Sequence, residues 1–260
     1  MFAEIRKQMI VDFVNQESNV TLGQLCEKFS VSPATVRNDL RALEKEGLLK
    51  RTHGGAISIR KVTYEPNAYQ KEIEHVSEKK MIAEVAFSMI EKGDSIALDT
   101  GTTTFELAKM LKDSEDITVV TYDLQIASYL EEYSGVDVFL AGGYLRRDFH
   151  CTTGKTTLDS LEGLNVDKAF LGANGIDLEH GAMTPHLDTA DIKEKIKTAA
   201  NRVILLADSS KIGKSSFVTF CGLDEIDVFI TDTNAPKAFI SELEKRDIDV
   251  KTITNDKKQK

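Results

Sequence analysis

Residues 21–59 read TLGQLCEKFSVSPATVRNDLRALEKEGLLKRTHGGAISI, and two helix-start signals stand close together in this stretch. Thr21 can accept hydrogen bonds from the free amides of a helix over 22–29. Ser32 can do the same for a second helix, and Pro33 suits its first position because a missing N–H costs nothing there. The stretch therefore predicts two short helices joined by a tight turn.

A basic hairpin is predicted directly after the second helix. Gly47 can end that helix, and the pattern that follows predicts strands at 48–51 and 56–59 around a turn at residues 53–55. The cations of this hairpin, which we call the wing, are Lys50, Arg51, His53 and Arg60.

The second helix has two chemically different faces. Val36, Leu40 and Leu43 recur at four and three residues, which places them on one apolar stripe. The opposite face and its flanks present small, polar and cationic side chains: Ala34, Thr35, Arg37, Asn38, Arg41 and Lys45. These side-chain types contact base edges and phosphates when a helix enters the major groove.

An Arg-rich outer face on a single helix is more often only a solvated surface. Here the capped helix start, the two separate faces, the glycine turn and the clustered cations occur in the order typical of DNA-reading domains. We therefore expect contacts to double-stranded DNA from Ser32, Ala34, Thr35, Arg37, Asn38, Arg41, Lys45, Arg51, His53, Gly54 and Gly55.

The same residues resemble a known family. Ser-Pro-Ala-Thr-Val-Arg-Asn-Asp-Leu at 32–40, residues 43–47 and His-Gly-Gly-Ala at 53–56 resemble the amino-terminal winged helix-turn-helix of DeoR-type bacterial transcriptional regulators. The resemblance implies a DNA operator as partner.

Length and charge agree with two functional parts. A chain of 260 residues has room for a reader of about 60 residues and a larger domain with its own core. Residues 1–60 contain nine Lys or Arg against seven Asp or Glu, whereas the remainder contains 24 against 35. This segregation argues against a chain that coats nucleic acid indiscriminately.

In the amino-terminal helix we expect Ile5, Met9 and Phe13 to face the reader's core.

Several function classes find no support in the sequence. Cys26, Cys151 and Cys221 lack the spacing of zinc or redox sites, and we expect reduced thiols, no metal and no cofactor. No apolar run approaches the roughly 20 residues that span a bilayer, and the first helix bears acids unlike a signal peptide. We therefore expect no membrane partner and a cytoplasmic location.

The remainder alternates apolar runs with amphipathic segments, which predicts a mainly parallel α/β sheet covered on both faces. Strands are predicted at 95–98, 118–121, 136–140, 169–173, 203–206 and 228–231, and helices at 78–89, 105–111, 124–132, 189–199 and 235–245. The expected domains are a winged helix-turn-helix at 1–59, a linker at 60–78, an α/β sensor at 79–255 and a polar tail at 256–260.

Two loops at strand ends are candidate ligand sites. The first is Asp99, Thr100, Gly101, Thr102, Thr103 and Thr104, where a glycine, hydroxyls and a helix start can together bind phosphate. In the second, Asp208 and Lys211 could hold sugar hydroxyls and phosphate. An ordinary capped turn remains an alternative for the first loop, and a solvated pair for the second.

The carboxyl-terminal part also resembles the DeoR-type sensor, whose fold is similar to ribose-5-phosphate isomerase and whose effectors are phosphorylated sugars or related metabolites. Matching blocks are Asp99 to Thr104, Gly142-Gly143, 172–177, Lys193 and 208–213. Gly143 and Lys193 are thereby implied as effector residues, although a structural turn explains Gly143 equally well. Departures from the family pattern are Lys71, His75, Tyr122, Asp123 and Thr189. They are expected near the pocket rim and bear on which effector is bound.

We therefore predict a repressor of a carbohydrate operon that a phosphorylated sugar releases from its operator, acting as a homodimer or homotetramer. The rival from another class is a sugar-phosphate isomerase with Asp99 or Asp208 as base and Lys211 as its partner. No residue distinguishes repression from activation.

Overall fold

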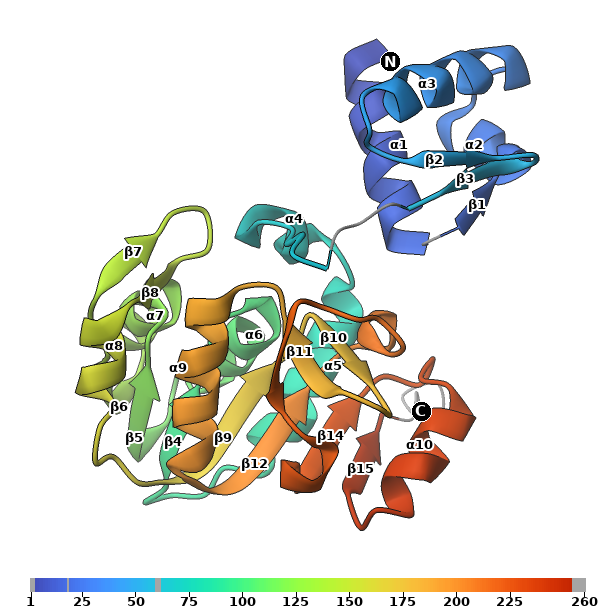
Figure 1. Cartoon of the computed structure of the whole chain (residues 1–260). Coiled ribbons are helices and arrows are strands. Elements are labelled where there is room, and N and C mark those ends of the chain that lie inside the picture. The colour runs from blue at the N-terminus through green and yellow to red at the C-terminus, as the bar shows by residue number, and fades with distance from the viewer. Residues whose placement is uncertain (1–2, 18, 59–61, 254–260) are drawn as a thin grey trace, which may run out of the picture. The chain divides into compact units, whose positions relative to one another are not determined.

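A computed structural model describes residues 3–17, 19–58 and 62–253, and the chain divides into two compact units, Met1–Tyr64 and Glu65–Lys260 (Figure 1). Ile59, residues 60–61 at the start of the expected linker and the expected tail 256–260 lie outside the described residues. Each unit has its own hydrophobic core.

The first unit is a winged helix-turn-helix. Its described elements are α1 (Ala3–Glu17), β1 (Asn19–Thr21), α2 (Leu22–Phe29), α3 (Pro33–Lys45), β2 (Lys50–Thr52) and β3 (Gly55–Ile57). The strands form an antiparallel sheet in the order β1-β3-β2. Strand β1 was not predicted, because it is only a few residues long and its last residue, Thr21, is also the cap of α2.

Both predicted helix starts are confirmed. Thr21 accepts a hydrogen bond from the amide of Gln24, whose side chain in turn accepts from the amide of Thr21. Ser32 Oγ accepts from the amide of Thr35 at 3.2 Å, and Pro33 is the first residue of α3. These reciprocal bonds satisfy amides that have no partner inside a helix, so the caps fix where each helix begins.

The apolar stripe of α3 is also confirmed. Val36, Leu40 and Leu43 are buried, and they pack in one cluster with Leu25 and Phe29 of α2. The two helices of the reader are therefore joined by the face that the sequence periodicity predicts.

The predicted core face of α1 is right for Phe13, which packs against the reader's core, and wrong for Ile5 and Met9. Ile5 and Met9 are 55% and 42% exposed, whereas Ile10 and Val14 are fully buried. The reason is an ion pair in which Arg6 Nε lies 2.7 Å from Oδ2 of Asp39 on α3. Arg6 lies four and eight residues before Ile10 and Val14, so this pairing turns their face toward α3.

The wing strands are shorter than expected and shifted along the chain. They pair Lys50 with Ile57 and Thr52 with Gly55, leaving His53-Gly54 as the turn. Gly55 is buried, and a Cβ at this position would lie 1.9 Å from the carbonyl oxygen of Val20. Only glycine lets β3 approach β1 so closely, which fixes where the strand begins.

The second unit is built around a seven-stranded sheet in the order β15-β14-β12-β9-β4-β5-β6, in which every neighbouring pair is parallel. Its strands are β4 (Ser95–Leu98), β5 (Glu115–Thr121), β6 (Gly135–Leu140), β9 (Val166–Gly172), β12 (Ala200–Leu206), β14 (Val228–Thr231) and β15 (Asp249–Thr252). The predicted parallel α/β architecture is confirmed.

Helices cover both faces of this sheet (Figure 1). The helices α5 (Val76–Phe87), α6 (Thr102–Met110) and α7 (Leu124–Tyr133) contribute to one apolar cluster, and α9 (Leu187–Thr198) and α10 (Lys237–Glu244) to the other. Burial on two faces explains why the strands read as continuous apolar runs.

Smaller elements escaped prediction because their segments are short and lack a regular apolar period. These are the hairpin β7 (Tyr144–Arg146) and β8 (Cys151–Thr153), the helix α8 (Lys155–Ser160), an antiparallel sheet of β10 (Gly175–Asp177), β11 (Gly181–Thr184) and β13 (Val218–Cys221), and two single helical turns at Ser209–Lys211 and Leu223–Glu225. The edge strand β15 was missed for the same reason.

The segment expected as a linker contains ordered structure. The helix α4 (Ala68–Ile73) is capped by Asn67, which forms a capping box with Gln70. The division between the units falls before Glu65. Residues 65–78 are thus part of the second unit, held there by contacts that no local sequence pattern indicates. Among the described residues, no helix is both long and apolar enough to cross a membrane.

Candidate DNA-reading surface and effector cavity

The outward face of α3 has the composition that DNA reading requires. Ala34, Arg37, Asn38, Arg41 and Lys45 are exposed, whereas Thr35 is half-buried beside its cap, Ser32. Arg41 Nη1 donates a hydrogen bond of 3.1 Å to Oδ1 of Asn38, which holds these two candidate DNA-contacting side chains side by side. Within the first unit, the outward face of α3 is therefore exposed and could enter the major groove of DNA.

The wing is tied to α3 through Arg51. Its Nε lies 2.6 Å from Oε2 of Glu44, and its backbone amide donates to the other carboxylate oxygen at 2.9 Å. His53 and Gly54 form the exposed tip. Gly55, expected to contact DNA, is buried against β1 instead, so packing explains its identity.

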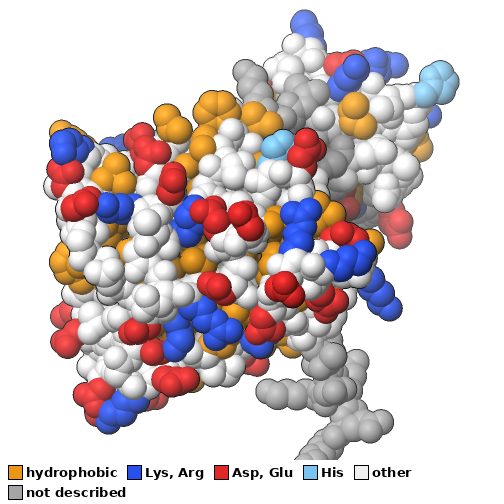
Figure 2. All heavy atoms as spheres, turned by 60° about the horizontal axis from the view of Figure 1, so that its bottom comes forward, with side chains coloured by type: hydrophobic (Ala, Val, Ile, Leu, Met, Phe, Trp, Pro, Cys, Tyr) orange, Lys and Arg blue, Asp and Glu red, His pale blue; other side chains and the backbone are white. Residues whose placement is uncertain are grey.

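The acidic excess of the second unit does not form a continuous field on the face that Figure 2 shows. There, Asp and Glu side chains are interspersed with Lys and Arg. The outward face of α3 and the wing, with Arg37, Arg41, Lys45 and Lys50 exposed, thus differs from this surface of mixed charge.

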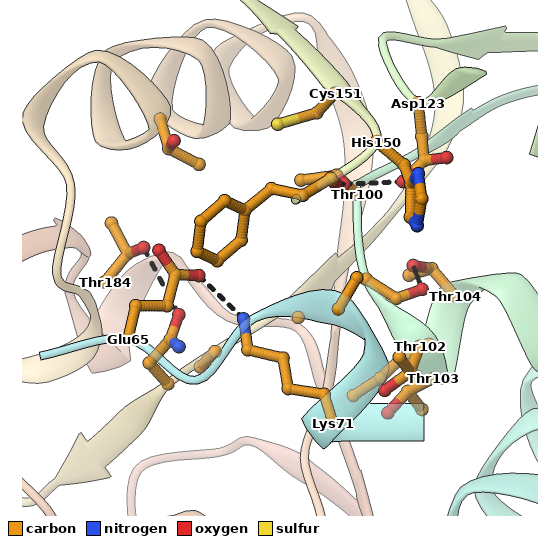
Figure 3. Close-up of a pocket in the computed structure, with 18 of the residues that line it drawn as sticks. Glu65, Lys71, Thr100, Thr102, Thr103, Thr104, Asp123, His150, Cys151 and Thr184 are labelled. Carbon is orange, nitrogen blue, oxygen red and sulfur yellow. Dashed lines mark hydrogen bonds and ion pairs between the residues drawn. The ribbon is translucent and has the colours of Figure 1, made fainter. Parts of the chain in front are cut away.

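A cavity lies at the carboxyl ends of the central strands of the second unit (Figure 3). Its lining includes Glu65, Ala68, Lys71, Glu74, Lys79, Thr100, Gly101, Thr102, Thr103, Thr104, Asp123, Gln125, Arg146, Phe149, His150, Cys151, Gly172, Ala173, Asn174, Thr184, Thr189, Lys193, Leu206, Ala207, Asp208 and Lys211. This is the sheet edge at which ligands bind in open parallel α/β folds.

The loop after β4 lines the cavity with groups that can bind an anion. Gly101 has a φ of 149°, a conformation that glycine adopts without strain, and it precedes the first turn of α6. Thr104 Oγ1 donates to the Gly101 carbonyl at 2.8 Å, which keeps the loop closed. The first amides of a helix have no intrahelical acceptor, so Thr102 and Thr103 offer amides and hydroxyls to an anion.

Asp123 connects this loop to the next strand end. Its Oδ1 accepts from the amides of Gln125 and Ile126 at the start of α7, and its Oδ2 accepts from Thr100 Oγ1 at 2.5 Å. Burial raises the pKa of Asp123, while the hydrogen bond from Thr100 opposes this. Thr100 is thereby fixed by a neighbouring strand end.

Asp99, expected as an effector residue, lies beneath the cavity and does not line it. The residue is completely buried, its Oδ2 accepts from Lys193 Nζ and from the amide of Gly172, and its Oδ1 accepts from the hydroxyl of Tyr122. Since its oxygens are already bonded, Asp99 positions Lys193 rather than a ligand. Lys193 also donates to the carbonyl of Gly172 at 3.0 Å and does line the cavity.

A carboxylate from the start of the second unit reaches into the cavity. Glu65 Oε1 lies 2.6 Å from Lys71 Nζ on α4 (Figure 3). Glu65 Oε2 lies 2.7 Å from Arg146 Nη2 on β7. The Arg146 guanidinium stacks 3.7 Å above the ring of Phe149. Burial acts to raise the pKa of Glu65, but the two cations outweigh burial and lower it, so Glu65 is ionised at neutral pH.

The second predicted loop lies across the cavity. Asp208 Oδ1 accepts from the amide of Ser210, and Lys211 Nζ lies 4.0 Å from Asp208 Oδ2. Lys79 of α5 donates to the carbonyls of Lys71 and Glu74 at the end of α4. Burial first, and then the charge of Lys211, lower the pKa of Lys79 to about 8.

The structure brings most of the predicted effector residues together. Thr100, Gly101, Thr102, Thr103, Thr104, Lys193, Asp208 and Lys211 line the cavity, whereas Asp99 and Gly143 do not. A Cβ on Gly143 would lie 2.1 Å from Thr157 Oγ1, so this glycine permits the β8–α8 turn to approach.

Sequence reasoning missed Glu65, Lys79, Arg146 and Phe149. Their segments reach the cavity only through contacts between residues far apart in the sequence. The nearby sequence signal was Lys71, which departs from the family pattern. Within the described ranges, no cluster of His, Cys, Asp or Glu has the make-up of a metal site. Burial raises the pKa of the cavity thiol Cys151 to about 11, so it is protonated at neutral pH.

Comparison with known proteins places both units in one family. The DeoR-like helix-turn-helix domain matches residues 6–62, and the DeoR C terminal sensor domain matches residues 74–233.

Curated relatives match almost end to end. The HTH-type transcriptional regulator GlpR of Haloferax volcanii is 40% identical over 87% of this chain and 89% of its own. The HTH-type transcriptional repressor GlcR of Bacillus subtilis is 35% identical over 98% of each chain, and a putative aga operon transcriptional repressor of Escherichia coli O157:H7 is 33% identical over 94% of this chain and 92% of its own.

Among solved structures, ribose 5-phosphate isomerase A of Methanocaldococcus jannaschii aligns with 52% of this chain and 53% of its own, with a TM-score of 0.39 and 17% identity, a likeness too distant to bear on the site. The relatives named above are regulators or repressors, which removes the isomerase alternative. With both of its units matched and its relatives aligned over nearly their whole length, the chain belongs to the DeoR family of DNA-binding transcriptional regulators.

Proposed function

We propose that this regulator represses a carbohydrate-utilisation operon and that a phosphorylated sugar lowers its affinity for the operator. Repression is favoured because relatives such as GlcR and the aga operon protein are named as repressors. The proposed partners are duplex DNA, read in the cytoplasm through α3 and the wing, and a sugar phosphate bound in the cavity of the second unit.

The observation that carries the effector proposal is that cations and hydroxyls line one cavity together with the first turn of α6. Lys71, Lys79, Lys193 and Lys211 line the same cavity as Thr102 and the other threonines of the loop after β4. Helix amides and lysines bind phosphate oxygens, while threonine hydroxyls can donate to or accept from sugar hydroxyls and carboxylates can accept from them. A phosphate group can bind Lys79, whose hydrogen-bond partners are two backbone carbonyls and not a carboxylate, whereas an unphosphorylated sugar offers no charge to this cation, so a phosphorylated sugar fits better.

The proposed reading mode requires more than one copy of the chain. The helix α3 is 13 residues long, and a single helix of this length reads only a few base pairs. Two copies related by symmetry would read two half-sites and multiply the specificity, so we propose a homodimer or a homotetramer. Sedimentation equilibrium of the full chain with and without operator DNA would measure this state.

The effector proposal is tested by binding to both partners. Operator fragments selected from a random DNA library by the full chain would be used in mobility shifts with a panel of phosphorylated sugars. The matching unphosphorylated sugars provide the control. A true effector should release the DNA and, at a hundredfold excess over its dissociation constant, add roughly 2.7 kcal/mol to the free energy of unfolding. If no member of the panel either stabilises the chain or releases DNA, the proposal fails.

A further inference from the structure

Three cations of the effector cavity are already paired with the chain's own carboxylates. Lys193 is bonded to Asp99, and Lys71 and Arg146 both contact Glu65. A buried cation attracts an incoming anion strongly only when its own counter-ion is removed. An anionic effector that binds these paired cations therefore has to exchange places with an internal carboxylate.

Among the described carboxylates at the cavity, Glu65 is best placed for this exchange. Asp99 is sealed beneath the cavity by Tyr122, Gly172 and Lys193, and Asp123 is fixed by two amides of α7. Glu65 has no such backbone donors among its contacts, and its two partners are both cavity cations. In Figure 3, Lys71 lies between Glu65 on one side and Thr102 and Thr103 on the other.

The position of Glu65 in the chain connects this exchange to the reader. Glu65 is the first residue of the second unit and directly follows Tyr64, the last residue of the first. Pro66 and the capping box of Asn67 stiffen the chain after Glu65. Its two ion pairs are therefore a charged tether at the point where the sensor begins.

We propose that Glu65 is an internal counter-ion that occupies Lys71 and Arg146 in the effector-free regulator, and that the effector's phosphate replaces it and releases the segment that leads to the reader. This inference rests on the proposed function, because it requires an anion in the same cavity. The exchange supplies the differential binding that couples two sites: the effector binds best to the arrangement in which the tether is broken.

The first test measures binding of inorganic phosphate and of glucose 6-phosphate to the full chain by calorimetry. Glu65→Gln keeps the shape of the side chain and removes the competing charge. Both probes should bind this variant about tenfold more tightly, because the cost of freeing Lys71 and Arg146 is gone. The matched control is Glu72→Gln on α4, whose carboxylate accepts from Gln125 and does not line the cavity. This variant should bind both probes as the wild type does.

A second variant covers loss of folding. Removing the carboxylate leaves two cations without a charged partner, so Glu65→Gln could unfold. Glu65→Asp retains the charge but shortens the reach, and its affinity for both probes should lie between those of the wild type and Glu65→Gln. If only Glu65→Asp folds, tighter binding than wild type supports the exchange, and unchanged or weaker binding overturns it.

The consequence for the reader is measured separately. In the wild type, hydrogen–deuterium exchange of residues 62–70 should become faster when glucose 6-phosphate binds. Glu65→Gln should show fast exchange and about tenfold weaker operator binding without any ligand. Fast exchange without a change in operator affinity would overturn the release to the reader.

Two failures can be told apart. If the wild type binds a probe in the cavity and Glu65→Gln binds it no more tightly, the counter-ion proposal is overturned and the effector proposal stands. If neither the wild type nor any variant binds a phosphorylated probe, both are overturned.

Discussion

The hydroxyl of Tyr122 donates a hydrogen bond of 2.5 Å to Oδ1 of Asp99, beneath the effector cavity. Both residues are completely buried. Since Asp99 also accepts from Lys193 Nζ, the tyrosine helps to hold the carboxylate that orients a cavity lysine. Burial, followed by the charge of Asp99, raises the pKa of Tyr122, so the tyrosine remains a donor throughout the physiological range.

Tyr122→Phe should therefore destabilise the second unit. The change leaves a lone pair of a buried carboxylate without a donor, which costs about 1–3 kcal/mol of the free energy of unfolding. Urea denaturation followed by circular dichroism measures this difference. Tyr69→Phe, at a residue that is 70% exposed, is the matched control and should change stability by less than about 0.5 kcal/mol. Equal stability of the two variants would contradict the positioning role of Tyr122.

Arg37→Ala and Arg41→Ala should each weaken operator binding by about 1–3 kcal/mol. Both arginines are exposed on the outward face of α3, so their removal should leave the fold intact. Mobility shifts at several salt concentrations would separate a base contact from a phosphate contact. Loss of a phosphate contact makes the operator affinity less dependent on salt, whereas loss of a base contact leaves this dependence unchanged. Lys112→Ala on the second unit makes the same charge change and should bind the operator normally. Wild-type affinity in both arginine variants would remove the assignment of this face.

Thr103→Val should abolish release by the effector while leaving operator binding intact. Thr103 lines the cavity in the first turn of α6, and valine retains its shape without the hydroxyl that we assign to phosphate. The readout is a mobility shift with and without the sugar phosphate found by screening. Thr219→Val, at an exposed threonine of β13, should respond as the wild type does. Normal release in Thr103→Val would exclude this hydroxyl from the anion site.

Effector binding should weaken as the pH rises through about 8. The pKa of Lys79 is lowered to about 8, so the side chain is cationic below this pH and neutral above it. A sugar phosphate is already a dianion there, because its second pKa is about 6. The dissociation constant measured by calorimetry between pH 7 and pH 9 should therefore increase.

Lys79→Arg tests the assignment of this dependence, because arginine stays charged across the same range. The variant should flatten the pH profile, whereas Lys80→Arg at the exposed neighbouring position should retain it. If the wild-type dissociation constant does not change between pH 7 and pH 9, Lys79 does not contribute its charge to effector binding.

The reader and the parallel sheet could be predicted because their signals are local. Ser32 with Pro33 marks the start of α3 through backbone amides only three residues away, and the spacing of Val36 and Leu40 marks its buried face. Strands of the sheet read as apolar runs because both of their faces are covered. The core face of α1 failed in part because Ile5 and Ile10 offered two competing stripes, and the choice between them came from Arg6 and Asp39, 33 residues apart.

The candidate site also contains features that local sequence predicts and features that depend on contacts between distant residues. Local sequence was sufficient to predict that Thr100–Thr104 would line a cavity, because a glycine, hydroxyls and a helix start after a strand are recognised from neighbouring residues. It could not show that Asp99 lies below that site, since this depends on Tyr122 and Lys193 arriving from other elements.

Interactions within a few residues of one another thus specify the helix starts, the buried faces of the strands and the chemical class of the reading face. Pairings between distant residues, such as Glu65 with Arg146, arise only when the folded chain closes long loops and brings their charges into one cavity. Their partners cannot be read from spacing, because the energy of each pairing depends on burial that the whole fold creates.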